Sequence, residues 1–395
     1  MDEAVYAVWL SLAGGISTVK NSLCAGFFKS AKDAYEADAE QYLAAGVQRK
    51  DIEGYLNKDL TASENTVIRC RETGINIVSY WDETFPEKLK NIVPAPVVLY
   101  YKGELPDPKM LTVSSVGTRN GTRYGEKVAY KMCRLLAESG VTVISGMAKG
   151  NDSFALMGAL DGGKPAFAVL GTGVDVIYPS ENKELYNRIL ASGGGIISEY
   201  PPGTGPIARN FPKRNRIMAG LANGVLITEA PKSSGALITA SYALEYGKDL
   251  FASPGSLFSR ESDGVNMLIR DGKAKPVLNH LDILDEYAGL YTLTPKEQSN
   301  PPVPKNKLAP KKSIFAKKPK ESDDALTDKT SFAPADTGDE KSDLVLELLA
   351  GGDRHISEIA EITGISASET ASLLTMLELD GRVTPKAGGY FTRII

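Results

Sequence analysis

The alternation of two kinds of segment in the middle of the chain constrains its fold more than any other feature. Between about residues 76 and 288, short apolar runs of strand length alternate with stretches of helical spacing. The expected strands are "LTVSSVG", "VTVISG", "AFAVLG", "GIISEY", "GVLITEA" and "DLFASPG". The expected helices cover 123–139, 151–161, 181–192, 214–222, 235–246 and 263–271. This pattern predicts an α/β domain, in which a parallel sheet is covered by helices on both faces.

Smaller units flank this domain. Residues 1–75 show helical apolar spacing with glycine breaks, which predicts a small helical domain of the helix–hairpin–helix or SAM-like type. Its "AGGIST" segment matches a phosphate-binding hairpin only loosely, so we favour a packing role. Residues 341–395 contain three helix patterns with capping serines and then a hairpin at Gly388-Gly389, which predicts a winged helix.

Residues 289–340 have the composition of a linker. The stretch 301–320 has seven lysines and no acid, whereas 321–340 has seven acids and one lysine. Apolar residues are sparse, so such a segment buries too little surface to fold by itself. We therefore predict a disordered tether, first lysine-rich and then acidic.

Cysteine usage and the N-terminus predict a cytoplasmic protein. Cys24, Cys70 and Cys133 are scattered and odd in number, which fits reduced thiols rather than a disulfide framework or a metal site. The chain opens with "MDEAVYAVWL", which is acidic where a secretory leader is basic. No run of about 18 apolar residues occurs, so we expect no membrane span. His280 and His355 lie outside the glycine-rich strand ends, which weakens any metal or histidine-base site.

Two nucleotide-binding motifs are matched only in part. "GALDGGKP" fits G-x-x-x-x-G-K, but a proline stands where Ser or Thr would hold magnesium, and a strand follows instead of a helix. After the first strand, "VGTRNGTRYG" spaces its glycines by four, unlike the G-x-G-x-x-G dinucleotide fingerprint. The second strand ends in Ser145-Gly146, so no carboxylate is placed to hold a ribose. We expect neither a P-loop nor an NAD site.

Cations gather at the ends of the expected strands. The segment 208–216 carries Arg209, Lys213, Arg214 and Arg216, and no carboxylate lies between Tyr200 and Thr228, although the whole chain has a formal net charge of −4. Arg119 and Arg123 follow the first strand in a glycine-opened turn, where backbone amides form an anion site at a helix N-terminus. "SGMAKGND" repeats this design after the second strand, with Lys149 as its cation. Three such turns along one sheet edge predict an extended positive track.

An extended track fits a polyanion better than a single phosphate, because each neutralised phosphate releases counterions. Lys127, Lys131 and Arg134 follow on one helix face and fit the track and a solvated surface equally well. Candidates for base stacking are Tyr124, Tyr178, Tyr200 and Phe211, although most such aromatic residues belong to a core. The residues alone therefore predict a nucleic-acid backbone as the ligand.

These segments also resemble a known family. "VGTRNGTRYGEKVAYKMCRLLAESGVTVISGMAKGNDSFALMGAL", "AVLGTGVDVIYPSEN", "GGGIISEYPPGTGPIARNFPKRNRIMAGLANGVLITEA", "SGALITASYALEYGKDLFASPGS" and "GVNMLIRDGKAKPV" resemble the DNA-processing protein DprA, or Smf, family over about residues 80–288. The resemblance implies a Rossmann-like domain that binds single-stranded DNA without sequence preference and shields it from nucleases. It also implies RecA loading during natural transformation, a homodimer formed through the Rossmann-like domain, and no cofactor.

The resemblance transfers site residues motif by motif. The family's Gly-Ser-Arg turn corresponds to Gly117-Thr118-Arg119, with its arginine as a DNA contact, and its "FPxRNR" corresponds to the segment that starts at Phe211. Thr118 keeps the hydroxyl of the usual Ser, and Lys149 keeps the charge of a common Arg, whereas Asn151 and Leu156 depart from the usual Ile and His. The predicted DNA-binding residues are Gly117, Thr118, Arg119, Arg123, Ser145, Gly146, Lys149, Gly150, Asp152, Arg209, Phe211, Lys213, Arg214, Asn215 and Arg216.

The predicted winged helix has the wrong charge for DNA. Residues 341–395 hold eight acids and five bases, and the recognition-helix segment 366–380 has Glu369, Glu378 and Asp380 but no Lys or Arg. Repulsion from duplex phosphates opposes binding. We therefore predict that the winged helix contacts protein.

Two other functions remain as alternatives. A nucleotide-cleaving phosphoribohydrolase would use carboxylates at strand ends, for which Asp175, Glu199 and Glu229 are candidates, but its "PGGxGT" signature is absent. We favour the view that these carboxylates cap helices or pair with arginines. A scaffold that recruits an acidic protein through the basic patch is the other alternative. We predict no catalytic residue and no membrane partner.

Overall fold

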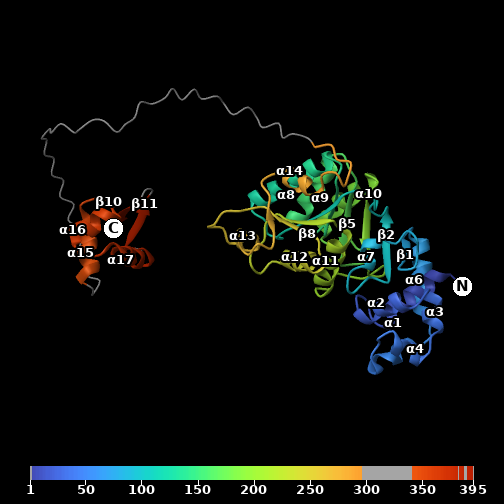
Figure 1. The fold of residues 1–395 in the computed structure, drawn as a ribbon. Coiled ribbons are helices and arrows are strands. Elements are labelled where there is room, and N and C mark those ends of the chain that lie inside the picture. The colour runs from blue at the N-terminus through green and yellow to red at the C-terminus, as the bar shows by residue number, and fades with distance from the viewer. Residues whose placement is uncertain (1, 296–339, 381, 387–388, 395) are drawn as a thin grey trace. The chain divides into compact units, whose positions relative to one another are not determined.

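A computed structural model describes residues 2–295, 340–380, 382–386 and 389–394. The chain divides into two compact units, Met1–Pro301 and Pro302–Ile395, each of which is described by itself (Figure 1). The predicted linker lies almost entirely outside the described residues. No helix in the described ranges is both long and apolar enough to cross a bilayer.

The N-terminal part of the first unit is helical, as predicted. Side chains of Asp2, Thr18, Ser30 and Asp38 each accept a backbone N–H at a helix start, which stabilises these short helices. Their apolar faces share one core cluster with a face of the central sheet, so the helices pack directly on the sheet. The helices are α1 Glu3–Ala13, α2 Val19–Phe27, α3 Ala31–Glu36, α4 Ala39–Ala44, α5 Ile52–Leu56 and α6 Thr61–Glu72.

A nine-stranded sheet forms the centre of the unit, in the order β1-β2-β6-β5-β4-β3-β7-β8-β9. All neighbouring pairs from β6 to β9 are parallel, which confirms the predicted α/β class, whereas β1 and β2 add an antiparallel edge that the sequence did not predict. The strands are β1 Asn76–Ser79, β2 Val98–Gly103, β3 Thr112–Val116, β4 Thr142–Ser145, β5 Ala166–Leu170, β6 Gly195–Ser198, β7 Gly224–Ile227, β8 Asp249–Ala252 and β9 Lys275–Pro276.

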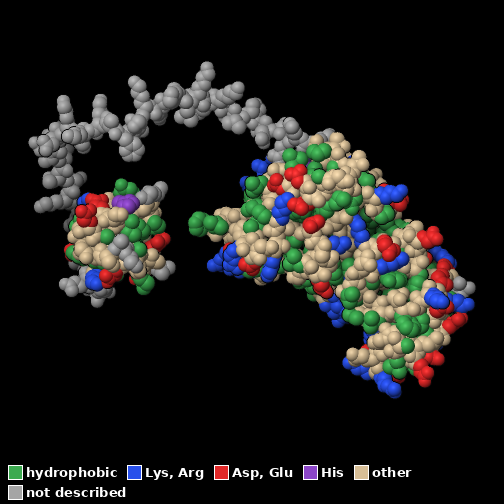
Figure 2. Space-filling view, viewed as in Figure 1, with side chains coloured by type: hydrophobic (Ala, Val, Ile, Leu, Met, Phe, Trp, Pro, Cys, Tyr) green, Lys and Arg blue, Asp and Glu red, His purple; other side chains and the backbone are tan. Residues whose placement is uncertain are grey.

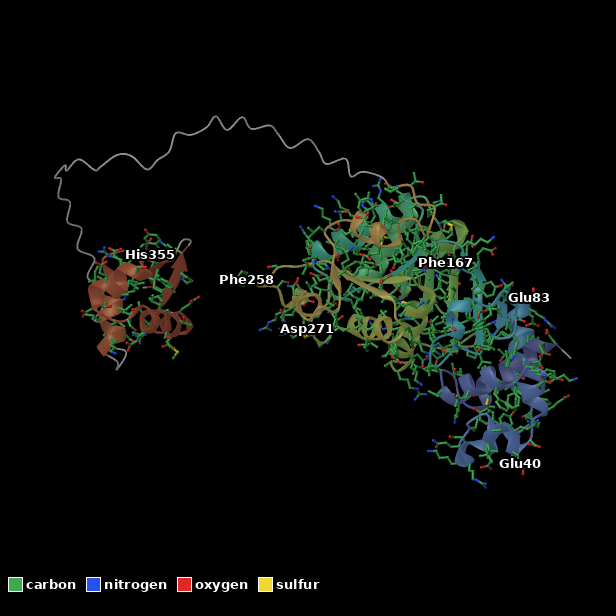
Figure 3. All side chains as sticks on the ribbon, viewed as in Figure 1. Glu40, Glu83, Phe167, Phe258, Asp271 and His355 are labelled. Atoms are coloured by element: carbon green, nitrogen blue, oxygen red, sulfur yellow. The ribbon has the colours of Figure 1, made fainter. Side chains whose placement is uncertain are left out.

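Helices cover both faces of the sheet because successive strand residues point to opposite sides. Val143 belongs to the core under α8 and α9, whereas its neighbour Ile144 belongs to the core under α11, α12 and α13. Phe167 also lies in the second core, and its central position is visible in Figure 3. The helices are α7 Glu87–Lys90, α8 Arg123–Glu138, α9 Asn151–Asp161, α10 Lys183–Ala191, α11 Asn210–Leu221, α12 Ala236–Glu245, α13 Asp263–Arg270 and α14 Leu281–Leu284.

One helix begins earlier than the sequence predicted. We expected a helix over 214–222 with "FPKRNR" just before it, but α11 begins at Asn210, so this segment forms its first two turns. Pro212 lies within the first turn, where the missing N–H has no helical partner to lose. Because this segment is helical, its residues point to different sides of α11 instead of lying along an open loop.

The second unit has the predicted winged-helix pattern of three helices and a hairpin. It has its own core, which includes Val345, Leu349, Ile359 and Leu374. The predicted Gly388-Gly389 turn falls partly outside the described residues, and Gly389 has a φ of 83°. Figure 2 shows acidic side chains on this unit. Its elements are α15 Glu340–Ala350, β10 Arg354–His355, α16 Ile356–Thr363, α17 Ala367–Leu379, β11 Val383–Lys386 and β12 Tyr390–Arg393.

The three cysteines are all buried in the first unit and are not paired with one another. Burial raises the pKa of Cys24 and of Cys133 to about 12, and that of Cys70 to about 11. The prediction of free thiols is therefore confirmed. At neutral pH these side chains are protonated.

Candidate nucleic-acid interface

A cavity of about 510 Å³, here called the switch-point pocket, lies at the carboxyl ends of β3 and β7. From β3 the chain continues through β4, β5 and β6 on one side of the sheet and returns to β7 on the other side. Parallel sheets bind ligands at such a reversal, because the flanking turns diverge there and leave a crevice. The pocket is lined by the turn after β3, the turn before α9, the start of α11 and the start of α12.

The turns after β3 and β4 pack tightly against each other. Asn151 N–H donates to the carbonyl of Thr118 over 3.2 Å, and Gly117 N–H donates to Asp152 Oδ1 over 3.3 Å. Gly150 has a φ of +81°, and a Cβ at this position would lie 2.5 Å from the carbonyl oxygen of Arg119. Glycine is therefore required at residue 150 for both its backbone conformation and its close approach.

Five of the predicted cations remain free for a ligand. Their side chains are exposed, and none of them forms an ion pair or a side-chain hydrogen bond within the described parts of the chain. Arg119 lines the switch-point pocket, while Lys149, Arg209 and Lys213 each adjoin a lining residue in the chain, and Arg123 begins α8. We call these five residues the free cations: Arg119, Arg123, Lys149, Arg209 and Lys213.

Two predicted arginines are buried instead, which corrects the assignment of Arg216 as a DNA contact. Arg216 is 1% exposed, and its Nη2 lies 2.6 Å from both carboxylate oxygens of Glu199. Arg214 is 3% exposed and donates to the carbonyls of Gly146 and Val169, although it forms part of the pocket floor. Burial lowers the pKa of Arg214 to about 10. Both arginines therefore hold the turns in place, and Arg216 presents no charge to solvent.

Other predicted residues also act inside the protein. Ser145 is buried and donates to the carbonyl of Ser115 over 2.7 Å, and buried Gly146 packs against Arg214, so neither reaches a ligand and both assignments are corrected. Asp152 and Asn215 line the pocket but are largely buried. Desolvation raises the pKa of Asp152 above its usual value, although Arg214 and the Gly117 N–H oppose that shift.

Gly117 and Thr118 line the pocket, as predicted. Thr118 is nearly buried, and its N–H donates to the carbonyl of Glu229 over 2.8 Å. These contacts fix the turn that carries Arg119. The free cation at residue 119 therefore stands on a rigid backbone.

The strand-end carboxylates are all engaged, as we favoured from the sequence. Asp175 pairs with Arg69 of α6 over 2.8 Å, and Glu199 pairs with Arg216. Glu229 accepts from Thr122 N–H over 2.8 Å and from Thr122 Oγ1 over 2.7 Å at the start of α8. None of them is arranged as a free acid or base.

Aromatic side chains form one small cluster beside the pocket. The rings of Tyr178 and Phe211 have centroids 5.5 Å apart, and Cζ of Arg119 lies 5.3 Å from the centre of the Phe211 ring. Tyr178 is 41% exposed, so the cluster offers a ring face to solvent. Tyr200 is buried, and its proposed stacking role is wrong. Tyr124 is exposed but lies outside this pocket.

One wall of the pocket was not predicted from the sequence. Ser233, Ser234 and Gly235 line it at the start of α12, together with Ile238. Their segment, "PKSSG", follows β7 just as the predicted cationic turns follow β3 and β4. The rule that ligands bind at the carboxyl ends of parallel strands would have identified this segment. It has a single cation, Lys232, and was not predicted as a cationic turn.

Comparison with known proteins agrees with this geometry. Residues 76–288 match the family model of DNA recombination-mediator protein A, and residues 329–389 match the DprA winged helix domain. The chain belongs to the DprA family. The Smf protein of Escherichia coli is 31% identical over 354 residues, which cover 89% of this chain and 87% of that protein.

Two further DprA comparisons concern Streptococcus pneumoniae. Its DNA processing protein DprA is 44% identical over 209 residues, or 53% of this chain and 73% of that protein. The X-ray structure of DprA from this species superposes with a TM-score of 0.57 and 35% identity, covering 68% of this chain and 98% of that one. The Rossmann-like fold and the family predicted from the sequence are thus confirmed.

Proposed function

We propose that this DprA-family protein binds single-stranded DNA without sequence preference, through the free cations and the aromatic cluster at the switch-point pocket. The observation that carries the proposal is that five exposed cations have no ion-pair partner among the described residues, one of them lining the pocket and three adjoining its lining residues in the chain. Phosphates along a flexible strand neutralise such cations whatever the base sequence is. The ring of Phe211 stacks any base, since every base has an aromatic face.

The pattern of burial separates this function from nucleotide cleavage. A hydrolase of this fold would need a free carboxylate, but Asp175, Glu199 and Glu229 are held by Arg69, Arg216 and Thr122. Asp152 lines the pocket, but it is largely buried and accepts a hydrogen bond from Gly117 N–H. We therefore propose a binding protein that is not an enzyme. Release of free base from nucleoside monophosphates by the purified protein would contradict this part of the proposal.

The decisive experiment measures affinity for oligo-dT by fluorescence anisotropy, at salt concentrations from about 50 to 200 mM. The variant Arg119→Ala/Lys149→Ala/Lys213→Ala should lower the slope of log K against log salt by about 2, at about 0.7 per lost phosphate contact. A double-variant control is Lys109→Ala/Lys164→Ala, which removes two exposed lysines that precede strands and should leave the slope unchanged. An unchanged slope in the triple variant would show that the pocket does not hold the strand.

Phe211 supports a separate check. Phe211→Leu keeps an apolar side chain against Gly171 but removes the ring, so affinity should fall by a stacking contribution of about 1–3 kcal/mol. The salt slope should stay the same, because no phosphate contact is lost. A lower salt slope in Phe211→Leu, without the expected loss of affinity from stacking, would argue that residue 211 acts only by placing Arg119.

We also propose that the protein protects incoming DNA, loads RecA onto it in transformation, and works as a homodimer in the cytoplasm. The support is membership of the DprA family. Light scattering of the purified chain tests the dimer. The rate at which RecA hydrolyses ATP on oligo-dT, with and without the protein, tests loading.

A further inference from the structure

A second hollow lies along α8, outside the switch-point pocket. It has a volume of about 290 Å³ and is bounded on the other side by the ends of β8 and β9. Val128, Met132, Val277 and Leu278 give it an apolar floor and rim. We call it the α8 groove.

The charged groups of the α8 groove are of one sign. Among the described residues that line it, the charged ones are Lys127 and Lys131, and both are exposed. They are four positions apart, so they stand on the same face of α8. Neither forms an ion pair in the described portion of the chain, whereas Arg134, one turn further, pairs with Glu138 over 2.9 Å. The positive charge at the groove is therefore uncompensated, while the end of the same helix is neutralised.

An aromatic ring stands at the end of the groove that is nearer to the pocket. Tyr124 is 48% exposed, and its hydroxyl donates to the carbonyl of Pro254 over 2.5 Å. This hydrogen bond joins α8 to the end of β8 and holds the ring in position. Tyr124 directly follows the free cation Arg123 and is five positions from Arg119 of the switch-point pocket. The groove therefore begins where the cationic turn after β3 ends.

We propose that the α8 groove is a second contact for the same single DNA strand, which passes from the switch-point pocket over Arg123 and Tyr124 to Lys127 and Lys131. This inference rests on the proposed function. Phosphates meet the two lysines, and sugars or bases lie on Tyr124 and the apolar floor. From Tyr124 to Lys131 the helix rises about 10 Å, which matches about three nucleotide steps of about 3.4 Å each.

An acidic amphipathic peptide is the other ligand that such a groove suits. The free cations favour the nucleic acid, because a strand that binds at Arg119 can continue past Arg123 to the α8 groove. A peptide would gain nothing from that continuity. The two ligands make opposite predictions for oligonucleotides of different length.

The test is the variant Lys127→Gln/Lys131→Gln, compared with Lys109→Gln/Lys164→Gln as a control of equal charge change. An oligo-dT of about six nucleotides occupies one site, whereas one of about 20 extends beyond it. For the long oligonucleotide, loss of two phosphate contacts should lower the salt slope by about 1.4 and weaken binding about 10- to 30-fold near 0.1 M salt. The short oligonucleotide should bind as tightly as before, and the control variant should match the unmodified protein with both.

The possible results separate the two proposals. Absence of oligonucleotide binding by the unmodified protein would overturn the proposed function and this inference together. Normal binding with an unchanged slope for the long strand in the variant would overturn the inference alone and favour the peptide. Equal loss with short and long strands would place the lysines at the first site, against the inference. A second readout is acylation of lysines by an amine-reactive reagent, in which only the long strand should protect Lys127 and Lys131.

Discussion

At the scale of single residues, the arginines at and after the start of α11 divide into those that serve a ligand and those that serve the fold. Arg209 is exposed and free, whereas Arg216, two turns further along α11, is enclosed with Glu199. Ser17, in the turn between α1 and α2, donates to the same carboxylate of Glu199. The buried pair therefore ties α11 to β6 and to the N-terminal helices at once.

This division predicts that the same substitution affects stability at Arg216 and DNA binding at Arg119. Arg216→Met leaves the carboxylate of Glu199 buried without its partner, so the free energy of unfolding should fall by about 3–5 kcal/mol. Arg119→Met should change it by no more than about 0.5 kcal/mol, as for other surface positions, yet weaken DNA binding. Urea unfolding and anisotropy measure the two quantities. If Arg216→Met kept full stability, the pair would not be a structural tie.

Lys88 predicts a pH dependence of stability. It lies on α7, its Nζ donates to Asn223 Oδ1 over 2.8 Å, and burial together with the charge of Lys248 lowers its pKa from 10.5 to about 8. Below pH 8 the folded protein must hold a charge that burial disfavours. Between pH 8 and 10.5 the unfolded chain binds more protons at this residue than the folded chain does, so stability rises with pH in that window.

Lys88→Met should therefore raise the thermal midpoint at pH 7. Its advantage over the unmodified protein should shrink as the pH rises from 8 to 10.5, where Lys88 becomes neutral. Asn223 Oδ1 still accepts from Thr112 N–H over 3.0 Å in the variant, so no acceptor is stranded. Differential scanning calorimetry across this range checks the trend. A gain that did not vary with pH would mean that packing and not charge controls this position.

At the scale of elements, the site depends on turns that touch each other after β3 and β4. Gly150→Ala should disturb them, because its Cβ would meet the carbonyls of Arg119 and Thr118 at 2.5 and 2.7 Å. Gly163→Ala is the matched control, since residue 163 has a φ of +77° but nothing within 4 Å of the added atom. Both variants should show the strain of a positive φ, of order 1 kcal/mol, whereas only Gly150→Ala should also lose affinity for oligo-dT. Equal affinity in the two would show that Arg119 does not depend on this contact.

The elements themselves were largely predictable, whereas their burial was not. Six apolar runs between glycine-rich turns identified the parallel strands, because buried strands need continuous apolar sequence. The start of α11 was missed by four residues, although a first-turn proline such as Pro212 is compatible with a helix. The burial of Arg216 could not be inferred locally, since its partner Glu199 is 17 positions earlier on a different element. The edge strand β1 was missed for a similar reason, because its pairing with β2 is a tertiary contact.

At the scale of the whole molecule, the two units have separate cores. Among the described residues, the clusters of the first unit use residues up to 293, and that of the winged helix uses residues from 345 onward. The winged helix also presents Glu369 and Glu378 on α17, with no basic residue on that helix. Its assignment as a protein-contacting unit stays a prediction, based on charge.

A chain that ends at residue 295 should therefore bind oligo-dT within about twofold of the full protein, because the free cations and the winged helix share no core. The full chain should likewise gain no affinity for duplex DNA from its winged helix. Anisotropy with single-stranded and duplex probes of equal length measures both effects. Duplex binding that disappears on truncation would reverse the prediction for the winged helix.

The enclosed thiols make this protein convenient for labelling. Cys24, Cys70 and Cys133 hold their protons until the solution is strongly alkaline, so a maleimide dye should leave the native fold untouched and react only when the chain opens. A new cysteine introduced beside the α8 groove would then carry the dye alone, and its emission would report directly on the passage of a strand.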